Sequence, residues 1–408
     1  MGAHTILLIG SLDTKGEDYT FLKSEIEKRG FSTITVDVGV LKKPSYPPDI
    51  PADQVAEAGG TSLEELRKEH DRGKALEVMQ RGVAAVARRI WDSSTGLCGV
   101  ISLGGGGGTA LGTSAMRELP MGVPKVMVST LSSGDTSPYV QVSDIIMFPS
   151  IVDVSGVNRI SRTVYTKAAS AVCAMADVYL SKETIDDKPL IAASMFGNTT
   201  TAVNHVKELL GKRGYEVIVF HATGTGGKTM EALTRAGNFT GILDITTTEL
   251  ADEVCGGELT AGRDRMSAAA ESGFPQVVTP ACVDMCNFWA LETVPEKYRE
   301  RKLHSWNPNV TLMRTNKEEN IEIAHLMAEN LNKATAPVEV YIPLKGFSEL
   351  DIPGGQFWDP DINNAFIKTL KENLRKDIPI IEMDNNINDP LFSASLADAI
   401  EKLIEKGE

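Results

Sequence analysis

The stretch Gly99-Val-Ile-Ser-Leu-Gly-Gly-Gly-Gly-Gly-Thr109 joins a short apolar run to five consecutive glycines and a threonine. The residues that follow, 110–116, have the pattern of a helix, so the whole segment predicts a buried strand, a loop and a helix. In open parallel sheets, ligands bind beyond the carboxyl ends of the strands. The glycine run therefore indicates both the fold class and the first place to look for a site.

Outward from this stretch, short β-branched runs alternate with longer helical patterns, which is typical of βαβ units and a mostly parallel sheet. A polar segment at 181–188 reads as a linker, after which the alternation restarts. We therefore predict an α/β protein with two tandem Rossmann-like, doubly wound domains, at residues 1–182 and 188–408. The region 282–309, rich in Trp, Asn and Pro, fits no element and is predicted to be a long functional loop.

Predicted strands of the first domain cover 6–9, 33–36, 99–103, 125–128 and 144–148, with helices at about 17–28, 62–92 and 159–180. Those of the second domain cover 190–194, 216–220, 240–244, 276–279, 310–313, 338–342 and 378–381.

The composition excludes several classes of protein. The 408 residues carry 42% hydrophobic and 24% charged side chains, which is globular composition. The net charge of −14 disfavours binding to a nucleic-acid backbone. No apolar run reaches the roughly 18 residues that a membrane helix needs. The amino end lacks the basic region of a secretion signal, and five cysteines form no disulfide framework, so we expect a cytoplasmic protein.

The glycine run gives the sharpest site prediction. Glycines let a backbone approach a ligand closely, and the free N–H groups of a helix start attract anions. Five glycines exceed what a strand–helix turn needs, although a tight turn is the simpler alternative. We predict binding of a phosphate or carboxylate by Gly104, Gly105, Gly106, Gly107, Gly108 and Thr109.

Two further loops of the first domain are candidates for the same site. Asp13, Thr14 and Lys15 follow the first strand, where a lysine suits a phosphate and an aspartate suits a metal or a hydroxyl. The alternative is a helix cap formed with Glu17. Ser132, Ser133 and Asp135 follow the fourth strand and read as a polar binding loop, with a solvated turn as the alternative.

The strand ends of the second domain are also polar, which predicts a site for a small anionic metabolite there. The loop Gly224–Lys228 is similar to the end of a phosphate-binding loop but lacks the first glycine of that motif. His304 is a candidate general acid–base and Asp284 a second proton-handling group, although structural roles are the common alternative. The predicted substrate-binding residues are Asn198, Thr199, Thr200, Lys228, Asp244 and Arg263.

Taken together, these loops resemble the ATP-binding domain family named for the tomato mosaic virus resistance protein of plants. The order and spacing of the motifs carry the resemblance, which covers essentially the whole chain. The matching stretches are Leu12–Gly16, Gly104–Thr109, Asp153–Asn158, Phe196–Thr200, Ala261–Arg265, Pro280–Met285, Asn307–Arg314 and Asp351–Gly355, with Phe357 and Asp359.

The resemblance implies two Rossmann-like subdomains, a homodimer and binding of ATP with Mg²⁺, in which the glycine run and the Asp13–Lys15 loop serve the nucleotide. It also implies a separate barrel-type enzyme as a candidate partner. Arg263 stands where relatives have a proline, a change that affects anion contacts in the second domain.

The function predicted from these observations is nucleotide binding by an ATP-dependent enzyme that acts on a small anionic metabolite in an interdomain cleft. Two alternatives stay open. One is a non-catalytic, nucleotide-responsive dimeric module. The other is an enzyme for small carboxylates or phosphosugars that does not use ATP.

Overall fold

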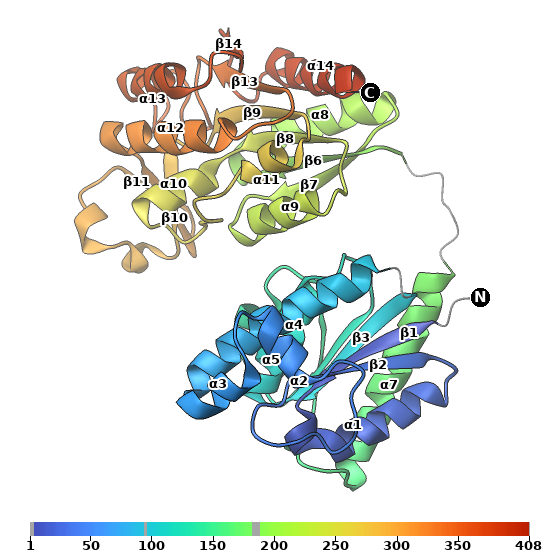
Figure 1. Cartoon of the computed structure of the whole chain (residues 1–408). Coiled ribbons are helices and arrows are strands. Elements are labelled where there is room, and N and C mark those ends of the chain that lie inside the picture. Colours follow the sequence, from blue (N-terminus) through green and yellow to red (C-terminus); the bar gives the residue numbers. More distant parts are fainter. Residues whose placement is uncertain (1–3, 94–95, 182–187, 408) are drawn as a thin grey trace. The chain divides into compact units, whose positions relative to one another are not determined.

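The computed structural model describes residues 4–93, 96–181 and 188–407, and the chain divides into two compact units, Met1–Ile185 and Asp186–Glu408 (Figure 1). Each unit is built on a parallel sheet with helices on both faces, which confirms the predicted α/β, Rossmann-like class. Most of the segment predicted as a linker, 182–187, lies outside the described residues.

The N-terminal unit has one five-stranded parallel sheet in the order β2-β1-β3-β4-β5. Its strands are β1 (Thr5–Gly10), β2 (Ser32–Asp37), β3 (Leu97–Gly104), β4 (Lys125–Ser129) and β5 (Ile146–Pro149). In register, Gly10 lies opposite Asp37 and Gly104 opposite Ser129. The segments that follow these strands therefore emerge at the same edge of the sheet.

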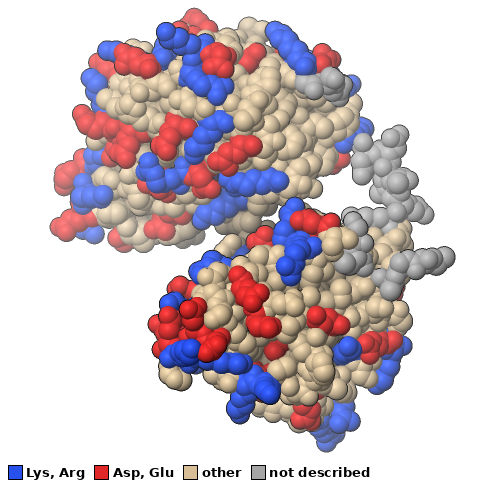
Figure 2. Space-filling view, viewed as in Figure 1, with Lys and Arg blue, Asp and Glu red and all other residues tan. Residues whose placement is uncertain are grey.

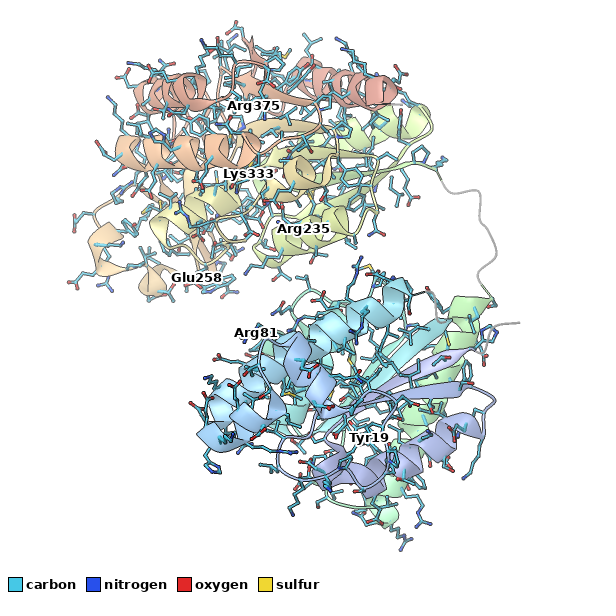
Figure 3. The ribbon with its side chains drawn as sticks, in the orientation of Figure 1. Tyr19, Arg81, Arg235, Glu258, Lys333 and Arg375 are labelled. Atoms are coloured by element: carbon cyan, nitrogen blue, oxygen red, sulfur yellow. The ribbon has the colours of Figure 1, made fainter. Side chains whose placement is uncertain are left out.

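Helices cover both faces of this sheet because alternate residues of its buried strands point to opposite sides. Ile6 and Leu8 of β1 pack against α1 and α7, whereas Leu7 and Ile9 pack against the helices on the other face of the sheet. Tyr19, labelled in Figure 3, ties α1 to the sheet through hydrogen bonds with the main chain of Ile9 and Leu103. The helices are α1 (Leu12–Glu27), α2 (Ala52–Ala58), α3 (Leu63–Glu69), α4 (Arg72–Asp92), α5 (Gly106–Arg117), α6 (Ser137–Val140) and α7 (Arg159–Leu180).

One helix start differs from the sequence prediction. Helix α1 begins at Leu12, not near Glu17, so most of the predicted loop forms the first helical turn. The backbone leaves helical geometry only at Lys15, with φ −127° and ψ 21°. The Asp37 carboxylate fixes this early start by accepting the N–H of Leu12 at 3.0 Å, a long-range bond that local sequence patterns do not reveal.

The C-terminal unit has a six-stranded parallel sheet in the order β14-β13-β9-β8-β6-β7. The strands are β6 (Leu190–Met195), β7 (Glu216–His221), β8 (Gly241–Thr246), β9 (Gln276–Ala281), β13 (Val338–Pro343) and β14 (Ile380–Met383). Taken along the chain, the first five parallel strands of both units follow the same spatial order, 2-1-3-4-5, and the C-terminal unit adds a sixth.

The helices of this unit also form two layers. α8 and α14 pack on one face of the sheet, and α9 to α13 on the other. Their bounds are α8 (Thr200–Lys212), α9 (Thr225–Arg235), α10 (Thr248–Cys255), α11 (Ser267–Ser272), α12 (Lys317–Leu331), α13 (Pro360–Asn373) and α14 (Pro390–Gly407). Within the described residues of both units, no helix is long and apolar enough to cross a membrane.

A small antiparallel sheet corrects two predictions. The strand at 310–313 does not join the parallel sheet, and the region 282–309 is not simply a loop. Instead β10 (Met285–Phe288), β12 (Val310–Arg314) and β11 (Leu303–Asn307) form a separate sheet in that order, with two 3₁₀ turns, η2 (Leu291–Thr293) and η3 (Glu296–Tyr298), between β10 and β11. β11 is largely exposed, so it lacks the continuous apolar run that is typical of a buried parallel strand.

Candidate functional site

A cavity of about 710 Å³ opens at the carboxyl edge of the N-terminal sheet. Its wall includes residues that follow three strands: Ser11, Asp13, Thr14 and Lys15 after β1, Val38, Val40 and Leu41 after β2, and Gly105, Gly106, Gly107 and Gly108 after β3. β1 and β3 are spatial neighbours, and the winding direction reverses between them. Such a topological switch point is where doubly wound sheets bind ligands, so this cavity is the candidate site.

The glycine run has two parts that serve different purposes. A Cβ on Gly104 would lie 2.7 Å from Gly108 Cα, so glycine is needed there for chain packing, and a Cβ on Gly108 would make a tight contact of 3.3 Å with Leu103 O. A Cβ on Gly105, Gly106 or Gly107 would meet only ordinary contacts, the nearest at 3.7, 3.8 and 3.9 Å. None of these three has a positive φ. The fold itself therefore gives no steric reason for glycine at 105–107, whereas close approach of a ligand does.

The first turn of α5 presents main-chain N–H groups at this wall. Gly105 is the N-cap, and among the described residues no side chain caps the helix. Unpaired N–H groups and the positive end of the helix dipole favour an anion at such a start. Thr109, predicted to contribute a hydroxyl to the ligand, is fully buried instead. Its Oγ1 hydrogen-bonds Gly105 O at 2.9 Å and Ser129 Oγ at 2.7 Å, which fastens the loop to β4.

Asp13, Thr14 and Lys15 lie in the cavity wall, as the loop prediction requires. Asp13 Oδ2 accepts the N–H groups of Leu41 and Lys42 at 2.9 and 3.2 Å. Asp13 Oδ1 is buried and has no hydrogen-bond partner among the described residues. The Lys15 ammonium donates to Val154 O, so its charge is held by a main-chain carbonyl and by no carboxylate that the structure describes.

Sequence reasoning missed the wall formed by α3 and α4. These helices supply apolar side chains, including Leu66, Leu76 and Met79, and the charged residues Arg67 and Arg72. These two helices lie outside the loops that were predicted to bind a ligand, and their sequences have the ordinary pattern of amphipathic helices. No local sequence signal therefore marks them as part of a site. Acidic and basic side chains are interspersed over α3 (Figure 2), where Lys68 pairs with Glu64 at 2.6 Å.

The loop after β4 lies apart from the residues that line this cavity. Ser132 Oγ donates to Ser129 O at 3.1 Å and to Phe148 O at 2.9 Å. Asp135 accepts from Ser137 N at 3.0 Å and Ser137 Oγ at 2.6 Å, and it is exposed, as is Ser133. Neither Ser132, Ser133 nor Asp135 is among the lining residues. The structure shows the turn that was the alternative interpretation of this loop.

In the C-terminal unit, the main-chain N–H groups of the glycine loop after β7 already bind a carboxylate of the protein itself, that of Glu249. Glu249 Oε1 accepts the N–H groups of Gly224 and Gly227 at 2.8 and 3.1 Å. A Cβ on Gly227 would lie 2.2 Å from Glu249 Oε2. The loose anion loop predicted here is thus filled by an internal carboxylate. Lys228, its predicted ligand-binding residue, is exposed.

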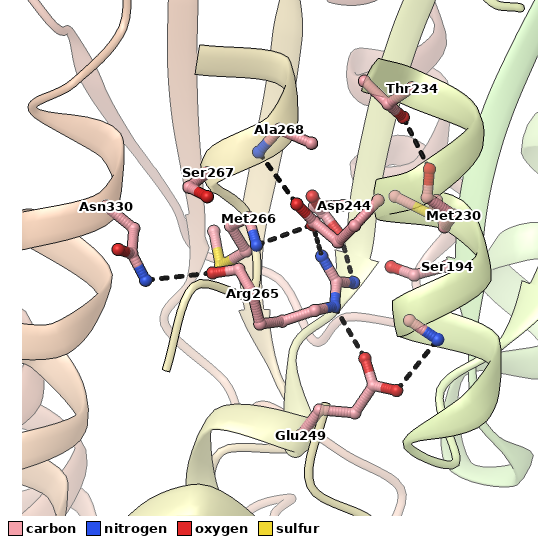
Figure 4. Close-up of polar contacts among 12 residues, drawn as sticks. Ser194, Met230, Thr234, Asp244, Glu249, Arg265, Met266, Ser267, Ala268 and Asn330 are labelled. Atoms are coloured by element: carbon pink, nitrogen blue, oxygen red, sulfur yellow. Dashed lines mark hydrogen bonds and ion pairs between the residues drawn. The ribbon is translucent and has the colours of Figure 1, made fainter. Parts of the chain in front are cut away.

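Arg265 is the centre of a buried ionic cluster that includes Glu249 (Figure 4). Its guanidinium contacts Glu249 Oε2 at 2.7 Å, Glu231 Oε1 at 3.0 Å and Asp244 Oδ1. The second Asp244 oxygen accepts from Gln276 Nε2 at 2.8 Å. Burial raises the pKa of Glu231 and Glu249, while the guanidinium opposes that rise. Asp244, predicted to bind substrate, is therefore fully buried and paired within the protein.

The turn after β6 is also largely internal. Asn198 and Thr199 are fully buried. Thr199 Oγ1 lies 2.7 Å from Thr246 Oγ1, which joins the ends of β6 and β8, and Thr200 Oγ1 donates to Gly197 O at 3.0 Å. Asn198 Oδ1 has no hydrogen-bond partner among the described residues.

The two predicted proton-handling residues occupy different environments. Asp284 is fully buried, accepts from Ser348 Oγ at 2.8 Å and faces Asp351 and Arg314. Burial, reinforced by Asp351, raises the pKa of Asp284 to about 7. His304 lies on β11 at the surface, with Nδ1 2.7 Å from Gln356 Oε1.

Arg263 is exposed and its carbonyl accepts from Asn330. Among the described contacts, no hydrogen bond or ion pair joins Asp284, His304 and Arg263 into one group. Arg263 as the anion-binding residue and His304 or Asp284 as the proton-handling group therefore stay predictions, because a ligand that joins them needs no direct bond between them.

Comparison with known proteins gives matches over both units. Family models described as the N-terminal and C-terminal domains of an uncharacterised protein family (UPF0261) match residues 4–181 and 188–404. A UPF0261 protein of Clostridium tetani is 50% identical over 402 residues, covering 98% of this chain and 99% of that protein. The ToMV resistance protein Tm-1(GCR237) of Solanum lycopersicum is 38% identical over 98% of this chain, which spans 56% of the tomato protein.

Among solved structures, a thioesterase domain from the curacin biosynthetic pathway aligns with a TM-score of 0.27 and 12% identity. The alignment covers 52% of this chain and 91% of that domain. This likeness is too low to bear on fold or function.

Proposed function

The chain belongs to the UPF0261 family, and from the geometry of its N-terminal unit we propose that it is a nucleotide-binding protein that takes ATP into the cavity at the β1/β3 switch point. One observation carries the proposal. Gly105, Gly106 and Gly107 line the cavity although neither packing nor φ requires glycine there. Bare main chain at a helix start is what a phosphate needs in order to reach several N–H groups at once.

The remaining wall fits the other parts of a nucleotide. Lys15 lines the same cavity as the glycine run, and among the described contacts its ammonium is held by a main-chain carbonyl and by no carboxylate, so a phosphate can compete for it through a charge-assisted bond. Leu66, Leu76 and Met79 supply apolar surface for a base. A volume of about 710 Å³ lies within the usual range of roughly 300–1,000 Å³ for ligand sites.

Mg²⁺ is proposed as a companion of the phosphates. Asp13 and Asp153 line the cavity, and the buried Oδ1 of Asp13 has no hydrogen-bond partner among the described residues. Within the described residues, no group of three or more potential metal ligands exists. This donor set suits Mg²⁺, which usually binds one or two carboxylates and completes its shell with water and phosphate oxygens.

We propose binding and name no particular reaction, because among the described contacts no hydrogen bond or ion pair joins the two predicted proton-handling residues, His304 and Asp284. We also propose a cytosolic location, in keeping with five cysteines that are all free and buried. The test is calorimetric titration of the full chain with ATP, ADP, AMP and adenosine, with and without Mg²⁺. We expect affinity to fall as phosphates are removed. Equal affinity for ATP and adenosine, or no binding of any of them, would refute the proposal.

A further inference from the structure

The C-terminal sheet has a switch point of its own, between β6 and β8. These strands are neighbours, and the winding reverses there as it does between β1 and β3 of the first unit. The turn after β6 and the end of β8 meet at this point through the Thr199–Thr246 contact of 2.7 Å. By the general rule for doubly wound sheets, this is the second place in the chain where a ligand is expected.

An aromatic side chain from the antiparallel sheet covers this point. A Cβ on Gly197, in the turn after β6, would lie 3.2 Å from Trp306 Cζ2, so the indole packs directly on the glycine backbone. Trp306 nevertheless keeps 40% of its surface exposed. One part of the indole thus packs on Gly197, while the rest stays exposed and can stack with the C–H face of a ring.

His304 stands beside this indole, and its tautomer is set by Gln356. The two ring centroids of His304 and Trp306 are 6.3 Å apart. Gln356 Nε2 donates to Leu303 O at 3.1 Å, so the amide oxygen of Gln356 is the atom that faces His304 Nδ1, at 2.7 Å. An oxygen at this position accepts a hydrogen bond from Nδ1–H, so the proton of the neutral imidazole stays on Nδ1 and Nε2 is left as a hydrogen-bond acceptor.

The residue after Gly197 adds a second acceptor. Asn198 is fully buried, and its Oδ1 has no hydrogen-bond partner among the described residues. Buried polar atoms are nearly always paired, so an orphan oxygen beneath a switch point indicates a missing donor from a ligand or an ordered water. At the surface the site therefore offers the exposed part of Trp306 and the Nε2 acceptor of His304, which suit a ring that carries donors, and the Asn198 oxygen lies buried next to Gly197 in the chain.

We propose that the C-terminal unit binds a hydroxylated ring, that of a sugar or of the ribose of a nucleoside, stacked on Trp306. His304 Nε2 accepts a hydroxyl proton of that ring in a hydrogen bond, and Gln356 is the positioning residue that holds the imidazole in the required tautomer. All residues of this site belong to the C-terminal unit, whereas those of the proposed ATP cavity belong to the N-terminal unit.

The test uses the fluorescence of Trp306 in the full chain, isolated as the difference between the wild type and Trp306→Phe. Glucose, ribose, adenosine and adenine are each titrated to millimolar concentration. We expect quenching by the hydroxylated ligands and not by adenine. Quenching by adenosine but not by either free sugar assigns the ring to a nucleoside. Equal quenching by adenine, or no quenching by any compound, overturns the proposal. None of these outcomes bears on the proposed ATP cavity, because ATP binding is measured separately by calorimetry.

Variants separate positioning from packing. Gln356→Leu is expected to weaken binding at least fivefold and to shift the His304 proton toward Nε2, as read from ¹⁵N chemical shifts in the free protein. Trp289→Phe changes another exposed indole of the same unit and is expected to leave binding unchanged. An unaltered tautomer in a folded Gln356→Leu protein would remove the positioning role. Loss of binding in Trp289→Phe would show that the signal does not report on this site.

Discussion

Replacing Gly106 and Gly107 together by alanine gives the sharpest test of the N-terminal cavity. The new methyl groups would meet Leu131 Cδ1 at 3.8 Å and Leu76 Cδ1 at 3.9 Å, which are ordinary contacts, so no strain is expected. Alanine is favoured over glycine in a helix by about 0.5–1 kcal/mol. Both positions lie in the first turn of α5, so the double variant should be more stable than the wild type by about 1 kcal/mol.

Ligand binding should change in the opposite direction. Each methyl group projects from the wall that an anion must approach, so ATP affinity should fall at least tenfold, which corresponds to about 1.4 kcal/mol. Scanning calorimetry and titration calorimetry on the same protein measure the two effects. A gain of about 1 kcal/mol corresponds to about 2–4 °C in the unfolding temperature for a unit of this size.

Two other glycines serve as controls. Gly211 lies in α8, where a Cβ meets nothing within 4 Å, so Gly211→Ala should add helix stability and leave ATP affinity unchanged. Gly104→Ala should lower stability, because its Cβ would lie 2.7 Å from Gly108 Cα. Unchanged ATP affinity in the stable double variant would refute the assignment. A large loss of stability would show that glycine at 106 and 107 serves folding.

Three further predictions concern charge. Lys15→Ala should weaken the binding of ATP more than that of adenosine, as measured by titration calorimetry, because the Lys15 ammonium is available to a phosphate. Equal weakening of both ligands would mean that Lys15 serves to hold the loop through Val154 O. Arg265→Met should cost about 3–5 kcal/mol in urea unfolding, because three buried carboxylates lose their common partner, and a cost below about 1 kcal/mol would contradict that role. The pKa of Asp284 is raised from 3.8 to about 7, so the folded state binds this proton more tightly than the unfolded state does. The resulting contribution to the free energy of unfolding is fully present below about pH 4 and is lost as the pH rises through about 7. Asp284→Asn should flatten this pH dependence in thermal unfolding, leaving a share from Asp252, whose pKa burial also raises to about 7; an unchanged pH profile would contradict it.

Much of the fold was predictable because it rests on local patterns. The apolar run before Gly104 is β3, the small-residue helix over Arg159–Leu180 has the predicted bounds, and Asn158 caps it with a capping box. The antiparallel sheet was not predictable, because β11 is mostly exposed and its sequence has no continuous apolar run. Its pairing with β12 across a tight turn is therefore visible only in the structure.

The sequence alone determined that glycine loops end the strands of two doubly wound sheets, because strand, loop and helix propensities act over a few residues. Tertiary structure alone decided which loops remain open to a ligand. The loop at Gly224 is closed by Glu249, 25 residues away, and Asp244 is paired with Arg265, 21 residues away. The loop at Gly105–Gly107 receives no such internal partner among the described residues and borders a cavity instead. The physical reason is that burial forces polar groups to find partners, and the fold determines which partner each group meets.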